Sequence, residues 1–365
     1  MLKRPLFDFV IFAICGIYLR LGTSNLMCLV FFFFMAYFIS QIVKDGYKRI
    51  LPLFVLALLL GYLLSSSAEK SMSEDPVENE AVSGIGIVYD IGKTSSGNVK
   101  LKVKGTVDDP AFHNETVTLY MIHSEADGIS IGDEVKFFGT LTSFSMPSLP
   151  TGYHEKLYLV TRGYDAKFYP DTLERTGNVA HNLILFFCTL NEKVQDAFDR
   201  HLSSDDAAMV KALVTGDRDD LSQSTKDLFI QAGIFHILCI SGLHISFLLF
   251  FVEHFLQIIL RLSGKKSTPI TILFSIFFLL FVGFTPSVIR AVIMADMMLI
   301  GKCIGEEPDS MTNLGIAALI ILCFQPLYLF DAGFLLSFGT MFGIILIREK
   351  ADTLHKKETL AERCF

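Results

Sequence analysis

The stretch HILCISGLHISF, His236–Phe247, decides how this chain folds, because it places two histidines and a Ser-Gly pair inside an otherwise apolar segment. That segment, Ile234–Leu262, has 29 residues. As one continuous helix it would be about 43 Å long, whereas the hydrocarbon core of a membrane is about 30 Å thick. We expect the helix to break at Ser241 and Gly242, since glycine tolerates unusual backbone angles and a serine hydroxyl can pair the freed backbone groups.

The two histidines do not predict a metal site. In a continuous helix His236 and His244 would lie about 12 Å apart along the axis, too far to share one ion at ligand distances of about 2 Å. The 7 cysteines lie mostly in apolar surroundings and show no paired spacing, which predicts neither a zinc site nor a disulfide framework. We therefore expect no metal and no cofactor.

A catalytic alternative uses the same residues. Ser241 could act as a nucleophile with His244 or His236 as its base, which would make the chain an intramembrane hydrolase. The string ISGLH differs from the Gly-x-Ser-x-Gly elbow of hydrolases, and a Ser and a His three residues apart on a helix can touch without being catalytic. We expect that the chain is not an enzyme and keep the hydrolase as an alternative.

Composition predicts a polytopic α-helical membrane protein. Of the 365 residues 52% are hydrophobic and 34 are Phe, more than is usual for a soluble enzyme. Long uncharged runs, which can span a membrane, lie at Phe9–Leu19 with its flanks, at Asn25–Val43 and at Ile50–Leu64. A second apolar cluster extends from near Gly233 to Ile347. We expect the first run to be retained rather than cleaved as a signal peptide.

Between the two clusters the chain predicts a small water-soluble β domain. Apolar and polar residues alternate in GIGIVYDI, NVKLKVKG, TVTLYMI and DEVKFFGTL, which is typical of short antiparallel strands. A small barrel or sandwich is expected, either OB-like or a generic hairpin fold. The GKT string at Gly92–Thr94 predicts no nucleotide site, because five residues rather than four separate it from Gly86.

Charge suggests how these parts face the membrane. Lys3 and Arg4 precede the first span, and Lys44, Lys48 and Arg49 follow the second. Basic residues favour the cytoplasmic side, so we expect a cytoplasmic N-terminus and an extracytoplasmic β domain in the cell membrane. That domain has 10 Lys and Arg against 17 Asp and Glu, a net charge of −7, which does not suggest a phosphate-binding surface.

We expect five regions along the chain. They are three transmembrane helices in residues 1–64, the OB-like β domain in 65–178, amphipathic interfacial helices in 179–232, a transmembrane domain of broken helices in 233–348 and a polar tail in 349–365. In the third region Ser203 or Ser204 predicts a helix N-cap, and Gly216 and Gly233 predict helix ends.

The last transmembrane region contains further polar residues. Pro286 predicts a helix restart, and burial of Arg290 in a membrane would cost about 2.5 to 3.5 kcal/mol, so this residue needs a partner or a watery path. A split between two spans is expected at Gln325 and Asp331, which suit helix caps and pore groups equally well. Gly339 and Gly343 have the spacing of a close helix contact.

Four strings, in this order, resemble the ComEC-type competence family, whose members form a membrane channel that internalises transforming DNA. They are ALVTGDRDDLS, AGIFHILCISGLHISF, PSVIRAVIM and PLYLFDAGFLLSF. The resemblance covers essentially the whole chain, and it implies a channel component for the uptake of single-stranded DNA. Members usually continue into a metallo-hydrolase-like domain, whereas this chain ends at Phe365 without a His-x-His-x-Asp-His string. We therefore expect a truncated member that carries the N-terminal portion, with an inactive relative as a further alternative.

The resemblance also implies site residues and partners. The candidates for the DNA path are His236, Ser241, Gly242, His244, Arg290, Asp217, Arg218, Gln325 and Asp331. Each has a structural alternative, namely hydrogen bonds between helices or, for Asp217 and Arg218, an ion pair in a surface turn. A phosphate that enters against an inside-negative potential opposes about 2.3 kcal/mol per 100 mV. We therefore expect single-stranded DNA, the lipid bilayer, a cytoplasmic motor ATPase and an outer DNA receptor as partners, with homo-oligomerisation as a further possibility.

Overall fold

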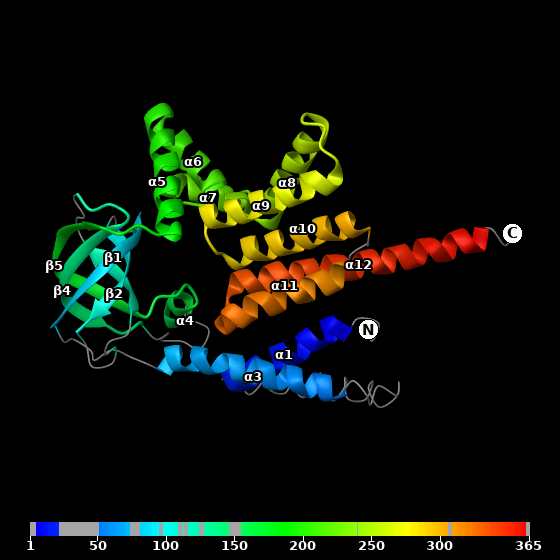
Figure 1. The fold of residues 1–365 in the computed structure, drawn as a ribbon, viewed down its shortest axis with the longest axis horizontal. Helices are drawn as coiled ribbons and strands as arrows, with labels where there is room; N and C mark the ends of the chain where they lie inside the picture. The colour runs from blue at the N-terminus through cyan, green and yellow to red at the C-terminus, as the bar shows by residue number, and fades with distance from the viewer. Residues whose placement is uncertain are drawn as a thin grey trace. The chain divides into compact units, whose positions relative to one another are not determined.

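The computed structural model describes most of the chain, which forms two compact units. The described residues are 5–21, 51–73, 81–94, 98–108, 112, 116–123, 128–145, 155–238, 240–305 and 309–362. The first unit comprises Met1–Glu69, Leu256–Pro269 and Ile289–Phe365, and the second comprises Lys70–Phe255 and Ile270–Val288. Figure 1 shows the elements along the chain.

A closed five-stranded barrel forms the β part of the second unit (Figure 1). Its strands are β1 (Ala81–Lys93), β2 (Val99–Val107), β3 (Val117–His123), β4 (Asp133–Thr142) and β5 (Ala166–Val179), and the short helix α4 (Glu155–Val160) precedes β5. The four strands predicted from alternation are confirmed as β1 to β4. The string at Gly92–Thr94 ends β1 and leads to β2, so it has no phosphate-loop geometry.

The expected antiparallel sheet is wrong in one respect, because the barrel is mixed. The strand order is β1-β2-β3-β5-β4, and all neighbours are antiparallel except β3 and β5, which run parallel from Leu119–Ala166 to Met121–Phe168. In a closed ring with an odd number of strands, alternating direction has to fail at least once. The chain between β3 and β5, which contains β4 and α4, is long enough for the crossover that a parallel pair needs.

The barrel interior is filled by the apolar residues of the alternating pattern. On β4, Val135, Phe137 and Leu141 point inward and are buried, while Lys136 and Phe138 between them are exposed. Phe137 meets Phe168 of β5 edge to face, with ring centroids 4.9 Å apart. This interior is one continuous apolar core, so the outward-facing residues of each strand are free to carry function.

Three helices follow the barrel, and their caps agree with the prediction. They are α5 (Leu183–His201), α6 (Ser204–Val214) and α7 (Gln223–Gln231). Ser203 caps α6 by accepting a hydrogen bond from the backbone of Asp206, and Ser222 caps α7 in the same way. Gly216 and Gly233 adopt positive φ angles of 81° and 70° just beyond the helix ends, a conformation that favours glycine.

The broken helices are present where the sequence predicts them. A 3-10 turn, η3 (Phe235–Leu238), precedes α8 (Gly242–Ile258); α9 (Gly264–Val282) ends before α10 (Pro286–Ile304); and α11 (Ser310–Phe324) is separated by η4 (Pro326–Phe330) from α12 (Ala332–Glu362). Helix α8 therefore begins at the predicted glycine and α10 begins at the predicted proline. Polar residues at these interruptions are placed at helix ends rather than along continuous helices.

In the first unit, α1 (Pro5–Leu21) packs closely against α3 (Leu51–Ser73) through glycine. A Cβ at Gly16 would collide with the Leu58 carbonyl oxygen, and a Cβ at Gly61 would collide with that of Ala13. Within the described chain, by contrast, no atom of another helix lies within 4 Å of a Cβ built at Gly339 or Gly343. The close contact expected at that pair is therefore found between α1 and α3 instead. The expected span at residues 25–43 lies outside the described residues.

The structure is mostly helical with one small mixed-sheet domain. Two of the described helical segments, Gly264–Val282 and Ala332–Ala351, are long and apolar enough to cross a membrane by length and composition. Shorter apolar helices lie at Val55–Ser66, Gly242–Ile258 and Ser310–Phe324. Helix α3 continues past Leu64 to Ser73, whereas the sequence predicted its end at the domain boundary.

Candidate functional site

The helix break at Ser241 is closed by its contact with His244. The backbone N–H of Ser241 donates to Nδ1 of His244 at 3.2 Å, and the Ser241 Oγ lies 2.9 Å from the same nitrogen. Because Nδ1 accepts from a backbone N–H it carries no proton, so the serine hydroxyl is the donor. Ser241 is the N-cap residue of α8, and its backbone N–H is bound by the side chain three residues later. This arrangement is a capping box in which histidine replaces the usual Glu or Gln.

The same geometry bears on the hydrolase alternative. A catalytic imidazole has to take the serine proton while a third group holds its other nitrogen. Here Nδ1 of His244 already accepts the Ser241 N–H within the helix cap, and His236 lies exposed on η3. Helix capping accounts for these contacts, so the expectation that the chain is not an enzyme stays a prediction.

Arg290 lies in the first unit and is held by uncharged groups. Its side chain is buried on α10, with 8% exposed. Its Nε donates to Ser337 Oγ at 2.7 Å, its Nη1 lies 3.9 Å from Met294 Sδ, and its Cζ is 5.8 Å from the ring centre of Phe338. The expected partner is thus a hydroxyl on α12. Within the described chain the positive charge of Arg290 is not neutralised by these contacts.

Gln325 and Asp331 occupy the helix ends that flank η4. The backbone N–H of Gln325 donates to the Ile321 carbonyl and closes α11. The Asp331 Oδ1 accepts from the backbone N–H of Phe334 at 3.1 Å and caps α12. Both positions therefore match the helix-cap alternative, and their role as pore groups stays a prediction.

Asp217 and Arg218 lie in the turn between α6 and α7, but they make different contacts. The Asp217 Oδ1 accepts from the backbone N–H of Asp219 at 2.9 Å, which shapes the turn. The Arg218 guanidinium carbon lies 5.8 Å from the ring centre of Phe235. The Asp217 carboxylate therefore shapes the turn, and the carboxylates of Asp219 and Asp220 contact other elements.

A side chain of α5 stabilises the end of α9, where the chain breaks before α10. Asn191 of α5 donates from Nδ2 to the carbonyl oxygen of Phe281 at 2.8 Å, near the end of α9. One turn earlier on each helix, Phe187 meets Phe277 edge to face with centroids 5.4 Å apart. Carbonyl groups at a helix end lack helical partners, so α5 satisfies one of those exposed by the break.

The outer surface of the barrel carries a cluster of basic and aromatic residues that the net charge does not reveal. Strand β2 places Lys100, Lys102 and Lys104 on its outer side, in alternation with buried Leu101 and Val103. Across the sheet, Lys102 pairs with Tyr120 of β3, and Tyr120 pairs with Lys167 of β5. We call this cluster the basic face; it comprises Lys100, Lys102, Lys104, Tyr120, Tyr158, Arg162, Tyr164 and Lys167.

Cations and rings are interleaved on the basic face. The Lys102 ammonium lies 4.9 Å from the ring centre of Tyr164, and that ring meets Tyr120 edge to face at 5.2 Å. The Arg162 guanidinium stacks on Tyr158 at 3.5 Å from the ring centre. Lys167 pairs with Glu155 at 2.6 Å. Burial lowers the pKa of Lys102 from its ordinary value, although nearby Asp90 acts in the opposite direction.

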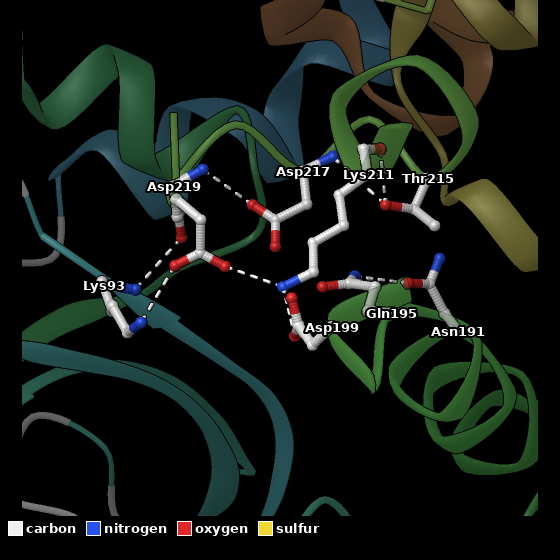
Figure 2. A network of polar contacts seen from close by, with 9 residues as sticks. Lys93, Asn191, Gln195, Asp199, Lys211, Thr215, Asp217 and Asp219 are labelled. Carbon is white, nitrogen blue, oxygen red and sulfur yellow. Dashed lines mark hydrogen bonds and ion pairs between the residues drawn. The ribbon is translucent and has the colours of Figure 1, made fainter. Parts of the chain in front are cut away.

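An ion network connects the barrel to the turn after α6 (Figure 2). Asp219 binds the Lys100 ammonium at 2.7 Å and accepts the backbone N–H of Lys93 at 3.1 Å. Asp220 binds the Lys93 ammonium at 2.9 Å with one oxygen and Lys211 at 2.8 Å with the other. We call Asp219 and Asp220 with these two barrel lysines the acidic clamp.

Lys211 anchors the acidic clamp from α6. Its side chain is 6% exposed and also pairs with Asp199 of α5 at 2.6 Å. Burial alone would lower the pKa of Lys211, but the hydrogen bonds to Asp199 and Asp220 raise it above its ordinary value. The hydrogen bonds that Asp220 accepts from Lys211 and Lys93 lower the pKa of that carboxyl. Both groups are thus held in their charged forms.

Sequence reasoning missed the basic face and the acidic clamp. The alternation VKLKVK was used to predict a strand, although it also places three lysines on one side of that strand. The clamp joins residues 119 to 127 positions apart, and no local spacing could have revealed it. The turn itself, GDRDD, was visible as a polar stretch.

Comparison with known proteins bears on the family. Residues 213–363 match the family model described as Competence protein. The ComE operon protein 3 of Bacillus subtilis (strain 168) is 27% identical over 221 residues, which cover 60% of this chain and 28% of that relative. No solved structure matches the chain. Both sequence matches confirm the resemblance found in the four strings: residues 213–363 match the competence family model, and the chain is similar to a ComEC-type competence protein.

Proposed function

We propose that this chain takes part in natural competence by passing a single strand of transforming DNA across the cytoplasmic membrane. In this proposal the barrel is an OB-type domain outside the membrane, and the broken helices enclose the path of the strand. The family match supports a role in DNA uptake. Two helices of spanning length support a multi-pass membrane location.

The observation that carries the proposal is the basic face. Proteins that bind single strands without sequence preference combine cations that follow the backbone with rings on which bases stack. The row Lys102–Tyr120–Lys167 across β2, β3 and β5 has both components, and the outer side of strands 2 and 3 is where OB-type barrels bind oligonucleotides. The domain's net negative charge is compatible with this use, since binding depends on the local arrangement.

Energetics require further proteins. Entry of each phosphate against an inside-negative potential is unfavourable by about 2.3 kcal/mol per 100 mV. We propose that a cytoplasmic ATPase supplies this work and that an outer receptor delivers the strand to the barrel. Arg290, the most deeply buried cation among the sequence candidates, would meet phosphates along the path through the helices.

Oligonucleotide binding by the purified full chain in detergent tests the basic face. Lys104→Ala removes an exposed lysine from the face, and Lys136→Ala removes a lysine that is also exposed, on β4, as the matched control. We expect Lys104→Ala to weaken the binding of a fluorescent single-stranded oligonucleotide and to reduce the slope of log K against log salt by about 0.7. Lys136→Ala should leave that slope unchanged.

The aromatic component has its own test. Tyr158→Ala should weaken binding by about 1 to 3 kcal/mol, the range for one stacked base, with little change in the salt slope. Equal behaviour of wild type, Lys104→Ala and Lys136→Ala would show that the basic face is not the site. In cells that produce the protein, uptake of labelled DNA should fall in the variants that weaken binding.

A further inference from the structure

The carboxylates of the acidic clamp bind one lysine of the basic face, Lys100, and a lysine of the adjoining strand, Lys93. Lys100 is in line with Lys102 and Lys104 on β2, yet its ammonium is bound by both carboxylate oxygens of Asp219, at 2.7 and 3.0 Å. Lys93, at the end of the neighbouring strand β1, is bound by Asp220. Two carboxylates of the turn 217–220 thus occupy positions that two phosphates of a bound strand could take.

From this geometry we infer that the turn is an internal competitor for DNA: it covers Lys93 and Lys100 in the free protein and is displaced when a strand binds the basic face. The inference rests on the proposed function of that face. It assigns a regulatory role to the turn in the string ALVTGDRDDLS. Binding of DNA to the barrel would release this turn, and the helices α6 and α7 that it connects, from Lys93 and Lys100.

The carboxylates that bind Lys93 and Lys100 on the barrel side can be replaced by other anions. The side chains of Lys100, Asp219 and Asp220 are about one-quarter to one-third exposed, and that of Lys93 is largely exposed. Ion pairs at such positions contribute little to stability because water and salt screen them. Lysine binds carboxylate and phosphate as a simple point charge, so replacing one anion with the other requires no rearrangement of the strand.

The contact on the helix side does not exchange in the same way. Asp220 keeps its second oxygen on Lys211, whose side chain is almost fully buried and also paired with Asp199. When the turn leaves the barrel, it therefore stays attached to α6 and α5. The turn can therefore leave the barrel lysines and keep its contacts with α5 and α6. Because it stays folded on these helices, it can bind the lysines again when the DNA leaves.

Gly92 provides a way to open the clamp without changing any charge. A Cβ at this position would lie 2.5 Å from Asp219 Oδ2 and would collide with Cε of Lys100. Gly92→Ala should therefore displace the ends of the Asp219 and Lys100 side chains from their contact while every lysine and carboxylate remains. Asp219→Asn has the same effect by removing the charge that binds Lys100.

The test measures binding of a fluorescent single-stranded oligonucleotide to the full chain in detergent. We expect Asp219→Asn and Gly92→Ala to bind up to about fivefold more tightly than wild type, the factor that corresponds to one exposed ion pair. Asp171→Asn, which removes one negative charge from an exposed position on β5, is the control and should bind like wild type. Thermal unfolding of each variant confirms that it is folded.

The outcomes separate this inference from the proposed function. If Lys104→Ala weakens binding but Asp219→Asn and Gly92→Ala bind no more tightly than wild type, the clamp is not a competitor and the basic face still stands. If Asp171→Asn tightens binding as much as Asp219→Asn, net charge rather than unmasking is responsible, and the inference is overturned. If Lys104→Ala binds like wild type, the face itself fails and the inference fails with it.

Discussion

Two buried cations in this protein are held in opposite ways. Lys211, in the second unit, is 6% exposed at its side chain and is bound by two carboxylates, Asp199 and Asp220. Arg290, in the first unit, is 8% exposed and contacts a hydroxyl, a thioether and an aromatic ring. The first cation is neutralised by the protein, whereas within the described chain the second is hydrogen-bonded but not neutralised.

The difference indicates which cation the fold requires and which it can offer to a ligand. A buried charge is unfavourable unless it is paired, so Lys211 and its carboxylates form a structural unit that joins α5, α6 and the turn. Arg290 keeps an excess positive charge in a region where burial is unfavourable. An anion that reached it would find no competing carboxylate among the contacts described, and a DNA phosphate is such an anion.

The largest effect on stability is expected at Lys211. Lys211→Met keeps the apolar stem but removes the cation that lies between Asp199 and Asp220, so that Asp220 keeps only its exposed contact with Lys93. Breaking a fully buried pair costs about 3 to 5 kcal/mol, and partial hydration of these two carboxylates reduces that figure to about 2 kcal/mol. Thermal unfolding of the purified chain should show a lower Tm.

Lys193→Met is the control for this change, because Lys193 is an exposed lysine on α5. Its Tm should stay within the error of the wild-type value. A Lys211→Met variant that unfolds at the wild-type temperature would mean that the ion network does not hold the helices together. Lys211 could then not be contrasted with Arg290 as a cation that the fold requires.

The next effect concerns Arg290 and appears in transport rather than in stability. Arg290→Met removes the charge and leaves Ser337, whose hydroxyl can bond a carbonyl of its own helix, so unfolding should change by less than about 1 kcal/mol. Under the proposed function Arg290 meets a DNA phosphate, and loss of that contact should reduce uptake of labelled DNA about tenfold, which corresponds to ~1.4 kcal/mol.

Arg290→Lys tests whether the charge or the fork geometry matters. Lysine keeps the positive charge but cannot reproduce the planar guanidinium, so uptake should lie between wild type and Arg290→Met at equal protein levels. Wild-type uptake in Arg290→Met would show that Arg290 only joins α10 to α12, as the structural alternative holds.

The sequence predicted most of the local structure because local rules determine it. The strands β1 to β4 follow from alternating burial, and the ends of α6, α7, α8 and α10 follow from Ser, Gly and Pro at positions where their backbone preferences count. The parallel pairing of β3 with β5 could not be predicted in this way. It arises from closure of a five-stranded ring, which is a property of the whole domain.

The candidate site was predictable only where its parts are close in sequence. Ser241 and His244 are three residues apart, and their contact was foreseen, although its capping geometry was not. Ser337 lies 47 positions from Arg290, so the need for a partner could be inferred but not its identity. The basic face and the acidic clamp depend on strand register and on a turn packed against the barrel, which require the folded domain.

A change of pH is expected to have the smallest effect near neutrality. Acidification should nevertheless distinguish the surroundings of Lys211 from those of Arg290 most clearly. Hydrogen bonds from Lys211 and Lys93 lower the pKa of Asp220 in the folded protein. Its contribution to stability is therefore present above the unfolded pKa of about 3.9 and is lost as the pH falls through the lower, folded value. The raised pKa of Lys211 gives a contribution that is complete below about 10.4 and is lost at higher pH, as the folded value is passed.

The contacts of Asp220 should therefore be unaffected between about pH 5 and 9 and should be lost below about pH 4. The hydroxyl, thioether and ring around Arg290 do not titrate in this range. Hydrogen exchange followed by mass spectrometry, corrected for the intrinsic pH dependence, can compare peptides that contain residues 217–222 with those that contain residues 337–341. We expect acid to remove protection from the first set and not from the second. Loss of protection in the first set already at pH 6 would mean that a group other than Asp220 controls the turn. The pairing of Lys211 with Asp220 would then not explain the difference between the two cations.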